Sequence, residues 1–259
     1  MQRVLISRIP EDIPSSFIRF LQDAPIYDSS CSETARVYFI DRDEGFFLKT
    51  APGGTLREEA ILNDFFHSLK LGPRMLAYES GPRDFLLTAR IPGEDCLQPE
   101  YLADPNRLCD VLGQTLRSLH DTPVAGCPVI HPAPDPVALS RAGIPEFHPR
   151  RYLGRNPFPT PEKAWQFLSE AAPGLGPEVL IHGDFCLPNI LLQAWQFSGF
   201  IDVGGGGLGS RYTDLFWGLW SLCYNLKTDR YSTRFLDAYG RDKIDPELLL
   251  AAAALEGFL

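Results

Sequence analysis

The chain has no apolar run approaching the roughly 20 residues that a membrane-spanning helix requires. Its six cysteines are scattered and include no C-x-x-C pair, which argues against a zinc site or a disulfide framework. The apolar run at residues 4–6 is too short for a signal peptide. The formal net charge of −9 argues against a nucleic-acid partner. These absences predict a cytoplasmic protein that binds neither membranes nor nucleic acids.

What the chain does contain is typical of a soluble enzyme. Of its 259 residues, 44% are hydrophobic and 22% are charged, so it can bury a substantial core as one large domain or as two lobes. The excess of acidic residues would attract a cationic small molecule, as a long-range bias that salt weakens.

The N-terminal part of the sequence is small and rich in predicted strands. These strands are residues 34–40, 45–50, 76–78 and 84–88. Residues 55–69 have the apolar spacing of a helix, with Thr55 as its expected cap and Glu58 as the capping-box partner.

The remainder is predicted to be mainly helical. Apolar patterns indicate helices at residues 101–120, 211–226 and 246–259, the last with Pro246 in its first turn. Ten of the 23 prolines lie between residues 123 and 161, too many for long uninterrupted helices. That stretch is therefore predicted to be an irregular insert.

The most informative segment is residues 181–192 together with residues 199–204. Asp184 lies five residues before Asn189, and Asp202 follows thirteen residues after Asn189. Two apolar runs flank a short turn between the last two, and a hairpin there would bring Asn189 and Asp202 side by side. Their hard oxygen ligands suit Mg2+ carried on nucleotide phosphates, and Asp184 could accept a proton from a substrate hydroxyl. The alternative is a hairpin with capping polar residues.

Upstream residues provide a second group with the same chemistry. Lys49 ends a predicted strand, and Glu58 and Glu59 open the next helix, so a Lys–Glu pair could neutralise phosphate charge or could be a surface ion pair. Ser32 lies in a loop of small polar residues that could contact phosphate or form an ordinary turn. Phe47 shares a strand face with Lys49 and could stack on a nucleobase or belong to the core.

Three further features are expected to support the site. His182 is interpreted as a structural hydrogen-bonding residue, because Asp184 already fills the role of base. Asp214, at the start of a predicted helix, is interpreted as a buried anchor or cap. The glycine run at residues 204–207 permits close backbone approach, or forms a flexible turn.

These motifs resemble those of the aminoglycoside 3'-phosphotransferases (kanamycin kinases), which have a protein-kinase-like fold. The resemblance rests on residues 182–190, 197–204 and 211–215, with upstream matches around Lys49, Glu59 and residues 91–93. It spans most of the chain and is weakest between residues 123 and 165. It implies an α+β, bilobal fold. Residues 1–91 would form a nucleotide-binding antiparallel-sheet lobe, residues 88–93 a hinge, and residues 94–259 a mainly helical catalytic and acceptor-binding lobe.

The resemblance also implies individual roles. Asp184 would be the catalytic residue, Asn189 and Asp202 would bind Mg2+, and Asp214 would brace the catalytic loop. The nucleotide would be held by Lys49 with Glu59, by Ser32 in the phosphate-covering loop, by Phe47 on the base, and by backbone groups of Thr88, Ala89 and Arg90.

The departures from the family fall on the acceptor side. Tyr224, Asn225 and Gly257 stand where acidic residues are expected, Gly205 replaces an arginine, and the insert around residues 150–155 is basic. The acceptor would be bound by the following groups: Asp184, Tyr224, Asn225, Glu256 and the terminal Leu259.

The resulting prediction is an enzyme that transfers a phosphoryl group from ATP, with GTP as an alternative donor, to a hydroxyl of a small molecule. Kanamycin-type aminoglycosides, modified at the 3'-hydroxyl, are the leading acceptor hypothesis, with antibiotic resistance as the implied role and a monomer as the expected state. Another hydroxylated antibiotic or metabolite is the second hypothesis. A non-catalytic nucleotide-binding regulator is the third, and the intact set of Lys49, Asp184, Asn189 and Asp202 argues against it.

Overall fold

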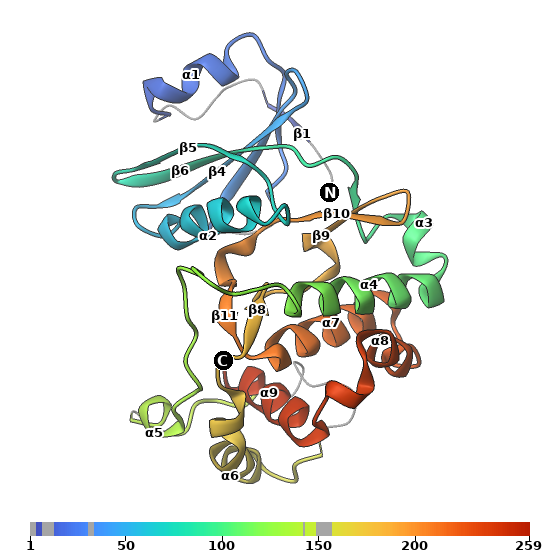
Figure 1. Cartoon of the computed structure of the whole chain (residues 1–259). Coiled ribbons are helices and arrows are strands. Elements are labelled where there is room, and N and C mark those ends of the chain that lie inside the picture. Colours follow the sequence, from blue (N-terminus) through green and yellow to red (C-terminus); the bar gives the residue numbers. More distant parts are fainter. Residues whose placement is uncertain (1–3, 7–12, 31–33, 142, 149–156) are drawn as a thin grey trace. The chain divides into compact units, whose positions relative to one another are not determined.

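The computed structural model describes residues 4–6, 13–30, 34–141, 143–148 and 157–259 (Figure 1). The chain divides into two compact units, Met1–Pro92 with Gly199–Gly204, and Gly93–Ser198 with Gly205–Leu259. The α+β class predicted from the sequence is confirmed. Within the described ranges, no helix combines the length and apolar character needed to cross a membrane.

The first unit is built on a six-stranded antiparallel sheet with the order β1-β2-β3-β4-β6-β5. Its strands are β1 (Val4–Leu5), β2 (Ile26–Asp28), β3 (Arg36–Ile40), β4 (Phe46–Pro52), β5 (Met75–Ser80) and β6 (Arg83–Ala89), and its helices are α1 (Ser15–Leu21) and α2 (Arg57–Ser68). Alternation along β4 buries Leu48 completely, between partly exposed Phe47 and Lys49. Helix α2 lies against this sheet (Figure 1), and its Ala60 belongs to one buried cluster with Ala51 and Leu86 of the strands.

The predicted cap of α2 is wrong. The helix begins at Arg57, and no side chain caps it in the manner expected of Thr55. Instead, the buried carboxylate of Asp84 on β6 accepts the backbone N–H groups of Gly54 at 2.9 Å and Leu56 at 2.7 Å. An ionised carboxylate forms stronger bonds to N–H groups than a hydroxyl does, so a residue distant in sequence takes the place of the local one.

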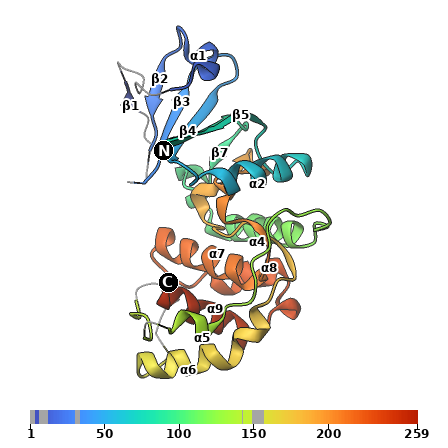
Figure 2. The same cartoon turned by 90° about the vertical axis from the view of Figure 1, so that its left-hand side faces the viewer.

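The second unit is mainly helical. Its helices are α3 (Pro99–Leu102), α4 (Pro105–His120), α5 (Pro136–Leu139), α6 (Pro161–Ala171), α7 (Arg211–Leu226), α8 (Ser232–Tyr239) and α9 (Pro246–Phe258). Figure 2 shows α4, α7, α8 and α9 packed together, in agreement with their mutual contacts. The helix predicted at residues 101–120 is two helices. Pro105 lacks an N–H and fits only a first turn, where the Asp104 side chain caps α4.

Two small sheets carry the loops of interest. They contain β7 (Glu94–Asp95), β8 (Val179–Ile181), β9 (Ile190–Gln193), β10 (Gln196–Phe200) and β11 (Gly207–Gly209), in the orders β10-β9-β7 and β11-β8. The β9–β10 turn places Ala194 and Trp195 at positive φ angles of 49° and 68°, without a glycine. The ring of Trp195 packs edge-on against Tyr101 and under the Arg107 guanidinium, which favours this turn.

The C-terminal helix is fixed by the proline-rich insert. Phe147 and Trp165 both pack against Phe258, and the N–H of His148 donates to the carbonyl oxygen of Gly257 at 2.6 Å. A Cβ atom on Gly257 would lie 2.5 Å from the Phe147 ring. The close packing of the insert therefore explains why a glycine occupies this position.

Candidate active site

In the first unit, Lys49 holds two carboxylates. Its ammonium donates to Glu59 Oε2 at 2.8 Å and to Asp202 Oδ1 at 2.5 Å. Lys49 comes from β4, Glu59 from the first turn of α2, and Asp202 from the segment just after β10. The side chains of Lys49 and Glu59 are mostly buried, whereas that of Asp202 is 52% exposed. The three form one charge cluster with its open side at Asp202.

The electrostatics of this cluster keep Lys49 protonated. Burial alone would lower the pKa of Lys49, but the neighbouring carboxylates of Glu59 and Asp202 outweigh it and raise that pKa. Burial raises the pKa of Glu59, an effect that Asp202 reinforces and Lys49 opposes. Asp202 lies at a φ of 58°, in the left-handed region that aspartate tolerates better than most residues.

In the second unit, Asn189 closes a short loop onto Asp184. Its amide nitrogen donates to the Asp184 backbone oxygen at 3.0 Å and to Asp184 Oδ2 at 2.8 Å. The five-residue spacing permits this because residues 187–189 form a single 3-10 turn. With the amide nitrogen directed at Asp184, the side-chain oxygen of Asn189 is its remaining group for a cation.

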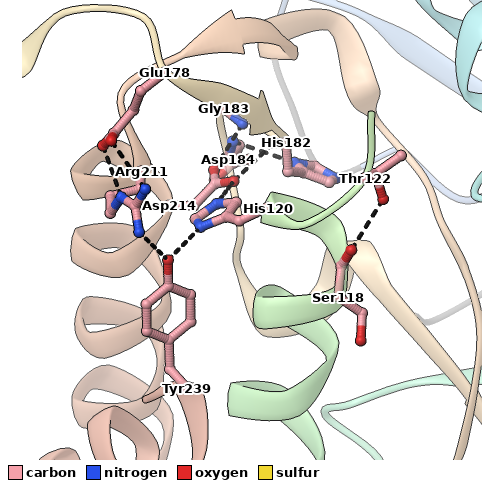
Figure 3. A network of polar contacts seen from close by, with 10 residues as sticks. All are labelled: Ser118, His120, Thr122, Glu178, His182, Gly183, Asp184, Arg211, Asp214 and Tyr239. Carbon is pink, nitrogen blue, oxygen red and sulfur yellow. Dashed lines mark hydrogen bonds and ion pairs between the residues drawn. The ribbon is translucent and has the colours of Figure 1, made fainter. Parts of the chain in front are cut away.

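Asp214 braces the start of the same loop (Figure 3). Its fully buried carboxylate accepts the N–H of His182 on Oδ2 and that of Gly183 on Oδ1, both at 2.8 Å, and it also contacts His120 Nε2 at 3.2 Å. His182 is itself fully buried, and its Nδ1 accepts the N–H of Asp184 at 3.2 Å. The backbone leading into Asp184 is therefore fixed by buried side chains.

The glycine run makes a close contact with this loop. Gly183 has a φ of 83°, and a Cβ atom there would lie 1.8 Å from the carbonyl oxygen of Gly205. His131 Nε2 bonds to the carbonyl oxygen of Gly206 at 2.7 Å, and Leu208 exchanges backbone bonds with residues 129 and 131. The run therefore permits close approach and is held by several bonds.

Sequence reasoning missed two residues that support the loop. Ser221 Oγ accepts the N–H of Leu187 at 3.0 Å, and His120 contacts Asp214 from the end of α4. Ser221 lies two helical turns after Asp214 in an otherwise apolar stretch of α7, and this buried polar position was the available indication.

The residues predicted to bind the nucleotide base are partly engaged within the first unit. The Phe47 ring packs against Phe39 with a centroid distance of 5.2 Å. Ala89 N–H donates to the carbonyl oxygen of Arg74, and Arg90 N–H donates to that of Gly45. Thr88 pairs with Phe47 across β4 and β6. Ser32 lies outside the described residues.

Apart from Asp184, the residues predicted to bind the acceptor lie in α7 (Tyr224 and Asn225), in α9 (Glu256) and directly after α9 (Leu259). Tyr224 is 58% exposed, stacks on Trp220 at 5.0 Å, and has the Lys227 ammonium 4.2 Å from its ring centroid. Asn225 is used internally, because its amide nitrogen donates to the backbone oxygen of Ser221. Glu256 is partly buried, and the terminal Leu259 is 59% exposed.

Comparison with known proteins identifies the family. The sequence pattern that defines the phosphotransferase enzyme family matches residues 30–251 of this chain. A probable aminoglycoside 3'-phosphotransferase of Lactococcus lactis subsp. lactis (strain IL1403) is 40% identical over 258 residues, which cover 99% of this chain and 97% of that protein. The chain belongs to the phosphotransferase enzyme family. It is therefore a phosphotransferase, as the sequence motifs predicted.

Solved structures of this family share the fold. An aminoglycoside-3'-phosphotransferase of type VIII superposes with a TM-score of 0.68 at 24% identity, covering 86% of this chain and 88% of that one. A Streptomyces rimosus aminoglycoside phosphotransferase, in complex with ADP and streptomycin, gives a TM-score of 0.67 at 21% identity, covering 86% and 90%. The predicted protein-kinase-like fold is confirmed.

Proposed function

We propose that this phosphotransferase moves the γ-phosphoryl group of ATP to a hydroxyl of an aminoglycoside, with the 3'-hydroxyl of kanamycin-type compounds as the leading acceptor. The observation that carries the proposal is the braced loop in which Asp214 fixes the backbone before Asp184 and Asn189 bonds to the Asp184 carboxylate. The name of the Lactococcus lactis relative supports the acceptor class.

Asp184 is proposed to orient the attacking hydroxyl and to accept its proton. Its carboxylate has a fixed direction because Asn189 holds Oδ2, so Oδ1 is the oxygen that would face the acceptor. Holding a hydroxyl in one orientation removes much of the entropy that opposes in-line attack. Phosphoryl transfer depends on such positioning and on stabilisation of negative charge.

Lys49, kept in place by Glu59, is proposed to bind the α- and β-phosphates. The relative solved with ADP supports a nucleotide of this type. When bound, Mg2+ would supply positive charge against the phosphate oxygens. The proposed ligands fit this role, because the Asn189 side-chain oxygen and the half-exposed Asp202 carboxylate are hard oxygen donors.

A different hydroxylated acceptor is the second candidate. Two observations favour it: the Phe147 ring lies 2.5 Å from where a Cβ atom of residue 257 would stand, and Tyr224 presents an aromatic ring where a carboxylate is expected. Each lost charge-assisted bond would weaken binding of a polycationic acceptor by about 1.5–3 kcal/mol.

The test is an ATP-turnover assay with an aminoglycoside panel, neutral sugars and macrolides, with the modified position read by NMR. We expect turnover on kanamycin with a 3'-phosphate as product. Turnover on other acceptors combined with none on any aminoglycoside would exclude the leading acceptor. Binding of Mg-ATP without turnover on any compound would instead favour a regulator.

The companion variant is Asp184→Ala. We expect the turnover rate to fall by about 10³-fold or more, because the proton acceptor is lost, while ATP affinity stays within a few-fold. Full turnover by this variant would show that Asp184 is not the base.

A further inference from the structure

We propose that Tyr239, supported by Arg211, is a positioning residue for catalysis, because its hydroxyl holds His120 in the one orientation in which His120 donates to Asp214. This inference rests on the proposed function, in which Asp184 is the base. It concerns Tyr239, which no sequence motif indicated, and Arg211, to which no role was assigned, and both lie outside the loop itself.

The contacts form an uninterrupted chain from the surface to the catalytic loop (Figure 3). Glu178 binds Arg211 through two bonds of 2.7 and 2.9 Å, and Arg211 Nη1 lies 3.4 Å from the Tyr239 hydroxyl. That hydroxyl lies 2.8 Å from His120 Nδ1, and His120 Nε2 lies 3.2 Å from Asp214 Oδ2. Elements α4, α7 and α8 each contribute to it.

The partners determine which nitrogen of His120 carries the proton. The Asp214 carboxylate can only accept, so the proton facing it belongs to Nε2 of His120. In the neutral imidazole Nδ1 then accepts, and the Tyr239 hydroxyl donates to it. The Tyr239 oxygen in turn faces the Arg211 guanidinium, which is always a donor, so the hydroxyl proton is left to point at His120 Nδ1.

The three innermost side chains in this chain of hydrogen bonds are buried, so the loss of one partner affects the next. The side chains of His120 and Asp214 are 1% and 0% exposed, and Tyr239 is 1% exposed, so water cannot replace a missing partner. Burial raises the pKa of Tyr239 to about 12, and its hydroxyl therefore remains a donor throughout the neutral range. Without that hydroxyl, Nδ1 has no partner in the protein, and the imidazole ring is held only through Nε2. The Asp214 carboxylate then loses a fixed donor on the oxygen that also holds His182 N–H.

The experiment compares Tyr239→Phe with Tyr212→Phe in the full chain. Tyr212 is a matched control, since its hydroxyl is also buried in the second unit and accepts one backbone N–H, that of Asp245, at 3.1 Å. Among the described residues its hydroxyl is not hydrogen-bonded to His120, Asp214 or Tyr239, although Arg211 and Glu178 act on it electrostatically. The measurements are thermal unfolding (Tm), steady-state kinetics (kcat and KM for ATP), the ¹⁵N imidazole shifts of His120, and amide hydrogen exchange at His182 and Gly183.

For Tyr239→Phe we expect the ¹⁵N shift of His120 Nδ1 to change, because that nitrogen loses its hydrogen bond, and exchange at His182 and Gly183 to rise as the ring becomes less fixed. We also expect kcat to fall by about 5- to 20-fold with KM for ATP within twofold, because a small displacement of the base is costly. Tyr212→Phe should lower Tm comparably. It should leave kcat, KM for ATP and amide exchange at His182 and Gly183 within twofold of wild type, and the His120 shifts unchanged. Unchanged His120 shifts, or equal kcat losses in the two variants, would overturn the proposal.

The two proposals fail separately. If the wild-type protein transfers no phosphate to any acceptor, the proposed function fails, whereas the imidazole shifts and amide exchange still decide whether Tyr239 orders His120 and the loop. An altered His120 with unchanged exchange at His182 and Gly183 would overturn the coupling to the loop.

Discussion

The Lys49 cluster of the first unit and the Asp184 loop of the second are held in place by different means. Lys49, Glu59 and Asp202 bond to one another through their charged side chains, and Asp202 is half exposed. The backbone around Asp184 is instead bonded to the buried side chains of Asp214 and Ser221.

This difference has a physical consequence. In the Lys49 cluster the loss of a charge can be compensated in part, by solvent at half-exposed Asp202 and by protonation of mostly buried Glu59. Buried acceptors of backbone N–H groups have no such substitute, so their loss costs stability and loop geometry together. Substitutions in the Lys49 cluster should therefore change ligand binding more than stability, whereas substitutions among the supports of the Asp184 loop should change both.

The largest effect is expected from Asp214→Ala. Two backbone N–H groups and His120 lose their acceptor, so the free energy of unfolding should drop by about 3 kcal/mol or more. The turnover rate should fall at least about 100-fold, since the loop positions Asp184. Denaturant unfolding and steady-state kinetics on the same samples check both. If Asp214→Ala kept normal stability and normal turnover, the supports of the Asp184 loop would not differ from the Lys49 cluster in the way proposed.

Lys49→Met should affect ATP binding more than stability. We expect the affinity for ATP to fall by about 10- to 100-fold, because a charge-assisted bond to phosphate is lost, while Tm falls less than in Asp214→Ala, because the Glu59 carboxyl, whose pKa burial raises, can take up a proton. Isothermal titration with ATP and thermal unfolding measure the two quantities. A large loss of Tm together with unchanged ATP affinity would place Lys49 among structural residues.

Asp84→Asn tests whether the rule for buried acceptors also holds in the first unit. Burial alone would raise the pKa of Asp84, but hydrogen bonds from Ser80, Gly54 and Leu56 outweigh it and lower that pKa. The stabilisation is therefore present above the ordinary carboxyl pKa of about 4 and is lost as the pH falls through the lowered value.

At neutral pH the Tm of Asp84→Asn should be about 3–6 °C below that of wild type, and the gap should close below about pH 4. Thermal unfolding across the pH range measures this gap. A gap that persists unchanged at low pH would contradict the assignment. ATP affinity should stay within twofold, because Asp84 lies outside the Lys49 cluster.

The smallest effect is expected from Tyr224→Glu. A carboxylate at this exposed position should tighten kanamycin binding by about two- to tenfold, through one charge-assisted bond weakened by solvent. Tyr231 lies at the N-cap position of the neighbouring helix α8, and Tyr231→Glu controls for the added negative charge. Equal changes in KM for kanamycin in both variants would indicate general attraction rather than a contact.

Local patterns were reliable where local forces dominate. Helix α7 begins and ends at the predicted residues 211 and 226, because its apolar periodicity is continuous. Prediction failed where a distant group competes. Asp84 replaces Thr55 at the start of α2, and the turn before Pro105 divides the helix expected at residues 101–120.

The sequence by itself determined the type of reaction, because Asp184, Asn189, Asp202 and Lys49 carry recognisable chemistry in a recognisable order. Asp214 was predicted to brace the loop, but only the tertiary structure decided which groups Asp214 and the other supporting side chains bond to. Asp214 lies 32 residues from His182 in sequence, and Tyr239 lies 119 residues from His120. Side-chain bonds across such separations leave no periodic trace, since they depend on how whole helices pack rather than on neighbouring residues.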